Sequence, residues 1–382
     1  MHLEDIKALY ESNKETTLKH RYITNNHIEP LLKKFENSLQ IKTLGYSVLN
    51  RPIYGLQLGH GNKKILMWSQ MHGNESTTTK ALFDLINTFL SNDSKVTHIL
   101  KSCTLYIIPI LNPDGAAAYT RVNANEVDLN RDAQNLTQPE SLILRDVFNT
   151  FKPDFCYNLH GQRTIFSAGK ENKPATVSFL APAQDAACTI TPTRKMAMEV
   201  IGVMNETLQE VIPNQVGVYD DAFNLNCVGD TFQSENVPTI LFEAGHYKND
   251  YARDETRRFI YISYISSLDY IANHDVAGNN YQNYFTIPEN EKLFYDVIIK
   301  DANVEDDNLV DIGIMYQEQL ADNEINFKPK VESIGDLKQF FGHKIINANG
   351  LEVKGMDGNS LYKGYENVFV IIHNEKISLF SK

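Results

Sequence analysis

The sequence predicts an α/β fold, in which helices cover both faces of a sheet, followed by a small all-β domain. From about residue 41 to 280, short apolar runs alternate with stretches of helical periodicity, an order typical of α/β folds. After about residue 285 the helical periodicity ends, and Asn-Gly and Asp-Gly pairs, which favour turns, separate short apolar runs. We therefore expect a helical segment over 1–40, a main domain over 41–280 and a β domain over 285–382.

The individual elements follow from local patterns, taken in chain order. Two helical stretches, IKALYE and IEPLLKKFENSL, lie in the first 40 residues. In the main domain, strands are predicted at KILMWSQ, TLYIIPIL, DFCYNLH, TVSFLAP and PTILFEA. Helices are predicted between them, at 76–91, 139–151, 191–211 and 254–273. In the β domain, strands are predicted at FYDVIIKD, DIGIMYQEQ, KIINANGLEV and NVFVIIHNEKISLF.

Composition and charge exclude several classes of protein. The 36 basic and 48 acidic residues give a net charge of −12, which argues against a nucleic-acid partner. No run of about 18 apolar residues predicts a membrane span. The first residues, MHLEDIKALYESNKE, lack the apolar core of a signal peptide. The four cysteines show no C-x-x-C pair and are expected to be free thiols. These features predict a cytoplasmic location without a membrane partner.

His72 and Glu75 lie where an apolar strand gives way to a helix, in ILMWSQMHGNESTTTKALF. In open α/β sheets, ligands bind beyond the carboxyl ends of the strands. A histidine and a carboxylate three residues apart can therefore bind one metal ion there. Taken alone the pair is a weak signal, because Glu75 could simply favour the start of the following helix.

His160 strengthens the metal hypothesis because it ends another predicted strand, in FCYNLHGQ. A lone histidine in this position is usually an ordinary rim residue. Two such histidines and one carboxylate supply three protein ligands, which leaves a fourth position open, as in catalytic zinc sites. We therefore predict one Zn²⁺ ion, held by His72, Glu75 and His160, that activates a water molecule.

A further carboxylate, Glu243, ends the run PTILFEA. Its role could be merely structural, as a cap or as the partner of an arginine. Beside a metal, however, it can act as the general base. In the segment LNPDGAAAYTRVNANEVDLNRD, Arg121 and Arg131 flank a loop, and Asn130 precedes the second arginine. Most arginines are solvated surface residues, yet one guanidinium here could stabilise an oxyanion and the other could grip a carboxylate.

The motifs HGNE, NPDG, DLNRD, NLHG and LFEAG occur in the order seen in the zinc carboxypeptidase (M14 metallopeptidase) family. The resemblance covers about residues 40–275, so that 41–280 resembles the family's catalytic domain. It implies a mixed, mostly parallel sheet flanked by helices, with His72, Glu75 and His160 as zinc ligands. Its implied function is hydrolysis of a peptide or amide bond next to a terminal carboxylate.

The same resemblance implies roles for the remaining residues. Glu243 is similar to the family's general base and Arg121 to its oxyanion arginine. Asn130 and Arg131 resemble the clamp for the terminal carboxylate of the substrate. Tyr219, in VGVYDDAF, resembles the mobile tyrosine that closes over substrate, although a half-buried loop aromatic explains it equally well. His246, just past Glu243, could support the metal site indirectly, but we expect it to be an ordinary surface histidine.

Two other functions compete with a carboxypeptidase. Zinc-dependent N-acyl amino acid deacylases of the aspartoacylase and succinylglutamate desuccinylase type have a similar metal site. NPDG and DLNRD favour the peptidase. A binding protein on a degenerate peptidase scaffold would be expected to lack ligands or base, and all of these residue types are present. No motif in the β domain indicates its role.

Overall fold

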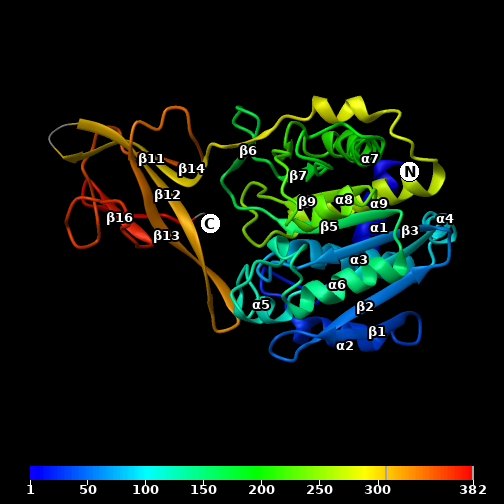
Figure 1. The fold of residues 1–382 in the computed structure, drawn as a ribbon. Helices are drawn as coiled ribbons and strands as arrows, with labels where there is room; N and C mark the ends of the chain where they lie inside the picture. Colours follow the sequence, from blue (N-terminus) through cyan, green and yellow to red (C-terminus); the bar gives the residue numbers. More distant parts are fainter. Residues whose placement is uncertain (306–307, 381–382) are drawn as a thin grey trace.

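An eight-stranded sheet organises the main domain (Figure 1). The strands are β1 (Gln40–Tyr46), β2 (Pro52–Gly59), β3 (Lys63–Ser69), β4 (Cys103–Ile108), β5 (Phe155–Gly161), β7 (Val177–Leu180), β8 (Val216–Val218) and β9 (Thr239–Ala244). In this computed structural model, which describes residues 1–305 and 308–380, their order is β1-β2-β4-β3-β5-β9-β7-β8. The central strands β4, β3, β5 and β9 are parallel, and antiparallel pairs flank them. The predicted mixed α/β sheet is therefore confirmed.

Helices cover both faces of this sheet. They are α1 (Leu3–Asn13), α2 (Asn25–Phe35), α3 (Thr77–Leu90), α4 (Thr97–Ser102), α5 (Pro113–Ala118), α6 (Pro139–Phe151), α7 (Pro192–Gln209), α8 (Val228–Ser234) and α9 (Asp254–Asn273), with short 3₁₀ turns η1 (Leu129–Arg131) and η2 (Tyr281–Thr286). Among the described residues, no helix combines the length and hydropathy needed to cross a membrane.

Strand β3 shows why the central strands are apolar runs without polar alternation. Successive side chains of a strand point to opposite faces. Ile65 and Met67 pack into a core with α1, α2, α3, α7 and α9, whereas Leu66 and Trp68 pack into a second core with α6 and α8. Because both faces are covered, every position of the strand favours an apolar side chain.

The C-terminal part is a separate set of small sheets with its own apolar core. Strands β11 (Phe294–Glu305), β12 (Asn308–Ala321), β13 (Glu324–Gly335) and β14 (Phe341–Asn347) form one sheet, and β15 (Val353–Lys354), β16 (Phe369–Ile372) and β17 (Glu375–Ser378) form another. Before them, β10 (Asn290–Lys292) pairs with β6 (Phe166–Ala168) of the main domain. Residues 381–382, which end the predicted β domain, lie outside the described residues.

Several local expectations differ from the structure. The run 367–380, predicted as one strand, is the hairpin β16–β17, which turns at His373 and Asn374 with φ values of 44° and 67°. Positive φ at two successive residues is typical of the turns that join paired strands. Strands β1, β2 and β13 were not predicted, because polar and charged residues interrupt their apolar patterns.

A buried ion pair ties the helices of one face to the N-terminal segment. Asp84 of α3 accepts from Arg257 of α9 at 2.5 Å (Nη2–Oδ1) and 2.6 Å (Nε–Oδ2), and both side chains are almost fully buried. Arg257 also donates to the carbonyls of Glu15 and Leu18. One guanidinium therefore joins α3, α9 and the segment between α1 and α2.

We expect Asp84→Ala to lower the free energy of unfolding by about 3 kcal/mol or more, because it leaves a buried guanidinium without its counter-charge. Asp5→Ala is the matched control, since Asp5 forms an exposed pair with Lys95 and such pairs contribute little. Urea denaturation followed by circular dichroism measures both. Equal denaturation midpoints for the two variants would contradict the role of the buried pair.

Candidate active site

The loop after β3 presents His72 and Glu75, and a neighbouring motif holds this loop in place. Leu111 and Asn112 donate backbone hydrogen bonds to the carbonyls of Ser69 and Gln70. A Cβ atom on Gly73 would lie only 1.9 Å from the carbonyl carbon of Gly115. Only glycine permits this approach, so the glycines of HGNE and NPDG fit together and fix the course of the loop.

The pairing of β5 with β9 brings two more side chains to the same edge of the sheet. These strands are parallel, and His160 lies directly opposite Glu243 in their register. Strand β3 is parallel to β5 on its other side. The carboxyl ends of three central strands therefore meet where ligands bind in open α/β sheets.

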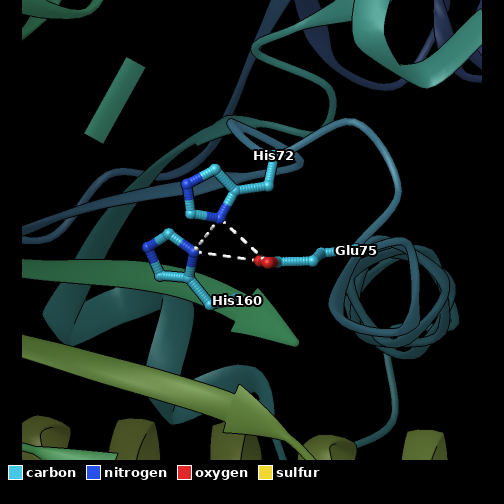
Figure 2. A group of neighbouring side chains, drawn as sticks. All are labelled: His72, Glu75 and His160. Atoms are coloured by element: carbon cyan, nitrogen blue, oxygen red, sulfur yellow. Dashed lines mark hydrogen bonds and ion pairs between the residues drawn. The ribbon is translucent and has the colours of Figure 1, made fainter. Parts of the chain in front are cut away.

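Figure 2 shows that His72 and Glu75, from the loop after β3, and His160, from β5, point toward one another. The Nδ1 atom of His72 lies 2.9 Å from Oε1 of Glu75 and 3.1 Å from Nδ1 of His160. The Nδ1 atom of His160 lies 3.0 Å from Oε2 of Glu75. Both imidazoles are buried and the carboxylate is largely buried.

This donor set fits a zinc ion. In a tetrahedral site with zinc–nitrogen bonds of about 2.0–2.1 Å, ligand atoms lie roughly 3.3 Å apart. The separations of 2.9–3.1 Å that join the two Nδ1 atoms to each other and to the oxygens of Glu75 are close to that value. Two neutral imidazoles and one carboxylate also form a donor set used by catalytic zinc sites. His72, Glu75 and His160 are therefore suited to hold the ion.

Asp128 orients one of these ligands, and the sequence interpretation did not assign it a role. Its Oδ1 atom lies 3.0 Å from Nε2 of His72, so that Nδ1 is the nitrogen that faces the other two ligands. Carboxylates commonly hold metal-binding histidines in this way. Asp128 is the first residue of DLNRD, and its acidic side chain beside two functional candidates was the available signal.

The two carboxylates of the site are in different electrostatic states. Burial alone would raise the pKa of Glu75, but the adjoining imidazoles of His72 and His160 outweigh it and hold that pKa below its usual range. Burial, reinforced by the negative charge of Glu75, raises the pKa of Glu243 well above its usual range. Separated pKa values of this kind suit one carboxylate for ligation and the other for proton transfer.

Arg121 lies at the rim of the site. Its Nε atom donates to Oδ2 of Asp128 at 3.0 Å, and its Nη1 atom lies 3.5 Å from Oε1 of Glu75. The side chain is 48% exposed, so the guanidinium can also be approached from the cleft. This position combines a positive charge with proximity to the metal ligands.

Asn130 and Arg131 lie in η1, next to Asp128. The side-chain oxygen of Asn130 accepts from the backbone N–H of Val228 at 3.0 Å, and Arg131 donates to the carbonyl of Asn130 at 2.7 Å. The first contact anchors the loop to α8. Both side chains line the same cleft as the metal ligands.

Tyr219 follows β8, and its hydroxyl donates to Oε1 of Gln162 at 2.7 Å. Its ring lies edge-on to Phe166, with centroids 5.3 Å apart.

His246 is buried rather than exposed, so the expectation of a surface histidine is wrong. It packs against the rings of Tyr251 and His343, because the β domain covers this part of the main domain.

One cleft of about 720 Å³ is lined by every residue that the sequence analysis assigned to metal binding, catalysis or substrate binding. Its volume is in the range of small-molecule sites. These residues are His72, Glu75, Arg121, Asn130, Arg131, His160, Tyr219 and Glu243. The structure therefore brings together candidates that are separated by up to 171 positions in the chain.

We expect the purified protein to bind one zinc ion per chain and His160→Ala to abolish this binding, as measured by metal analysis after dialysis. Asp128→Asn should weaken zinc affinity by about 10- to 100-fold, since it removes the carboxylate that orients His72. Asp220→Asn is the control, because Asp220 lines the cleft without a contact to the three ligands. Full zinc occupancy in His160→Ala would refute the site.

The comparisons with known proteins agree with this geometry. A family model described as zinc carboxypeptidase (Peptidase_M14) matches residues 24–180. Carboxypeptidase M of Mus musculus is 28% identical over 182 residues, covering 40% of this chain and 41% of its own. The chain thus spans less than half of the length of this curated relative, and 14% of carboxypeptidase D of Mus musculus.

Solved structures show the same fold. A metallo-carboxypeptidase from Burkholderia cenocepacia matches with a TM-score of 0.51 at 18% identity, covering 65% of this chain and 70% of that one. Bovine thrombin-activatable fibrinolysis inhibitor, solved in complex with tick carboxypeptidase inhibitor, matches with a TM-score of 0.51 at 12% identity, over 66% and 98% of the two chains. The family model and the curated relatives favour a carboxypeptidase over the N-acyl amino acid deacylase. Residues 24–180, which carry the three candidate ligands, thus match the zinc carboxypeptidase (M14) family, which the ordered motifs resemble.

Proposed function

We propose that this protein is a zinc carboxypeptidase that hydrolyses the amide bond next to the terminal carboxylate of a peptide. The observation that carries the proposal is the convergence of His72, Glu75 and His160 in a cleft that also contains Glu243. When bound, a zinc ion supplies Lewis-acid polarisation of the scissile carbonyl and acidifies the attacking water.

Glu243 supplies the proton transfer. Its carboxyl group lies on the strand next to that of His160, and its Oε2 atom is buried without a hydrogen-bond partner among the described residues. A carboxyl group with a raised pKa can accept a proton from the attacking water and deliver it to the departing amine. Arg121, at the rim beside Glu75, supplies positive charge for the oxyanion that forms on the carbonyl.

The terminal carboxylate of the substrate is assigned to Arg131 and Asn130. Arginine offers a planar pair of donors that matches a carboxylate. The backbone of this segment is fixed by the bonds of Asn130 to Val228 and to Asp128, and Arg131 donates to the carbonyl of Asn130. Tyr219, which borders the same cleft, is assigned to cover the bound substrate.

We expect Glu243→Gln to retain zinc and to lower kcat by about 10³-fold or more. The glutamine amide has the shape of the glutamate carboxylate but cannot accept a proton from water and pass it on. Glu206→Gln on the exposed side of α7 is the control and should match wild type. Zinc content and peptide turnover are measured on the same preparations. Wild-type turnover in Glu243→Gln would reject the assigned role.

We expect a peptide with a free terminal carboxylate to be cleaved at least about 100-fold better than its carboxamide, since the amide cannot pair with a guanidinium. Arg131→Gln should narrow this ratio, mainly by raising KM for the free acid. Mass spectrometry of a panel that includes N-acyl amino acids measures the preference. Selective cleavage of N-acyl amino acids would instead establish a deacylase.

A further inference from the structure

The cleft has a wall that does not come from the main domain. Its lining includes a run of β12, residues 315–318, and Glu332 of β13. Figure 1 shows β12 and β13 extending from the C-terminal sheets toward α5, across the end of the main sheet where the site lies. The two strands pair antiparallel over most of their length, so this wall is a hydrogen-bonded hairpin rather than a loop.

Polar contacts anchor the wall to the main domain beside the metal ligands. Glu318 of β12 pairs with Arg21 at 2.9 Å (Oε1–Nη1) and accepts from the hydroxyl of Tyr119 at 2.5 Å (Oε2). The residue after Tyr119, Thr120, accepts from the backbone N–H of Asn74. Because Asn74 directly precedes Glu75, this anchor of the wall lies beside the segment that carries a metal ligand.

A second anchor holds the same run of β12 from its other side. The buried carboxylate of Asp296 accepts from the backbone N–H of Tyr316 at 2.7 Å and from the hydroxyl of Tyr251 at 2.8 Å. The rings of Tyr251 and Tyr316 also contact each other, with centroids 5.0 Å apart. Residues 316–318 are thus fixed on both sides, and the wall cannot move away without breaking these bonds.

A β-bulge places Glu332 in the cleft lining. Ser333 pairs with Gly313 and Val331 pairs with Ile314, so Glu332 is the extra residue between two successive partners. Bulges of this kind re-aim side chains and occur beside active sites. Within residues 1–305 and 308–380, no hydrogen bond or ion pair is found for the Glu332 carboxylate, whereas Glu318 is held by Arg21 and Tyr119.

We propose that Glu332 binds the free α-ammonium group of short peptides and that the β12–β13 wall limits the length of the substrate. This inference rests on the proposed carboxypeptidase function. A cleft of about 720 Å³ accommodates a drug-sized ligand, which corresponds to a peptide of a few residues. Arg131 and Glu332 line this same cleft, so in this proposal Arg131 holds the carboxylate end of the peptide, its amino end meets the wall, and a longer peptide has to cross the wall.

The test compares peptides that share the same two C-terminal residues: a tripeptide, its N-acetylated form and a decapeptide. We expect the wild-type kcat/KM for the free tripeptide to exceed that for each of the other two peptides by about tenfold or more. The loss of a hydrogen bond to a charged group has an effect of about this size. Glu332→Gln should reduce the preference for the free amine to about twofold or less. Glu324→Gln, at the exposed turn of the same hairpin, should keep the wild-type ratios.

The outcomes separate this inference from the function on which it rests. Chelator-sensitive cleavage with equal kcat/KM for the free and acetylated tripeptides would overturn the role of Glu332 and leave the carboxypeptidase intact. Equal cleavage of the decapeptide would overturn the length limit. An unchanged ratio in Glu332→Gln would also overturn the ammonium assignment. Cleavage of no peptide by the zinc-loaded protein would reject the proposed function itself.

Discussion

The rest of the structure depends on one constraint: two imidazoles and a carboxylate converge in a place where water is largely excluded. The Nδ1 atoms of His72 and His160 lie 3.1 Å apart, and each is about 3 Å from an oxygen of Glu75. Burial of a carboxylate is costly unless positive charge or hydrogen bonds compensate it. The surrounding segments are arranged to supply that compensation, through the backbone N–H of Gly161 and the guanidinium of Arg121. A cation at the centre would complete it.

The topology of the sheet makes this convergence possible. Parallel strands end at one edge, so residues that follow β3, β5 and β9 meet there although they are far apart in the chain. The sequence could predict this much, because His72, His160 and Glu243 each end an apolar run and the central strands are buried on both faces. The boundaries of helices such as α6 and α9 also match the predicted ranges, 139–151 and 254–273. Local pattern and global fold agree for these elements.

The remaining features were not predictable because their causes are tertiary. Asp128 orients His72 across 56 positions of the chain, and no local pattern marks an acidic residue as the partner of a distant imidazole. The burial of His246 depends on His343, which arrives with the β domain. The alternation of charged and apolar residues in strand β13 is too weak to predict a strand. Its register with β12 places Glu332 in the lining of the cleft. A motif can identify a residue type, whereas these contacts exist only after folding.

The unsatisfied polar atoms that line the cleft support a preformed cleft rather than one assembled by substrate. Folded proteins leave few buried polar atoms without a partner, and each exception calls for an explanation such as a catalytic role or a bound water or ion. Among the described residues, both amide atoms of Asn158, the Nε2 atom of His160 and the Oε2 atom of Glu243 are of this kind, and all three side chains line the cleft. Their strands are held in register by β3 and β9, so these groups cannot turn away to find partners. The stability lost by leaving them unpaired is offset elsewhere in the fold. The rigidity of the central strands therefore keeps the polar groups of the cleft poised for a polar ligand.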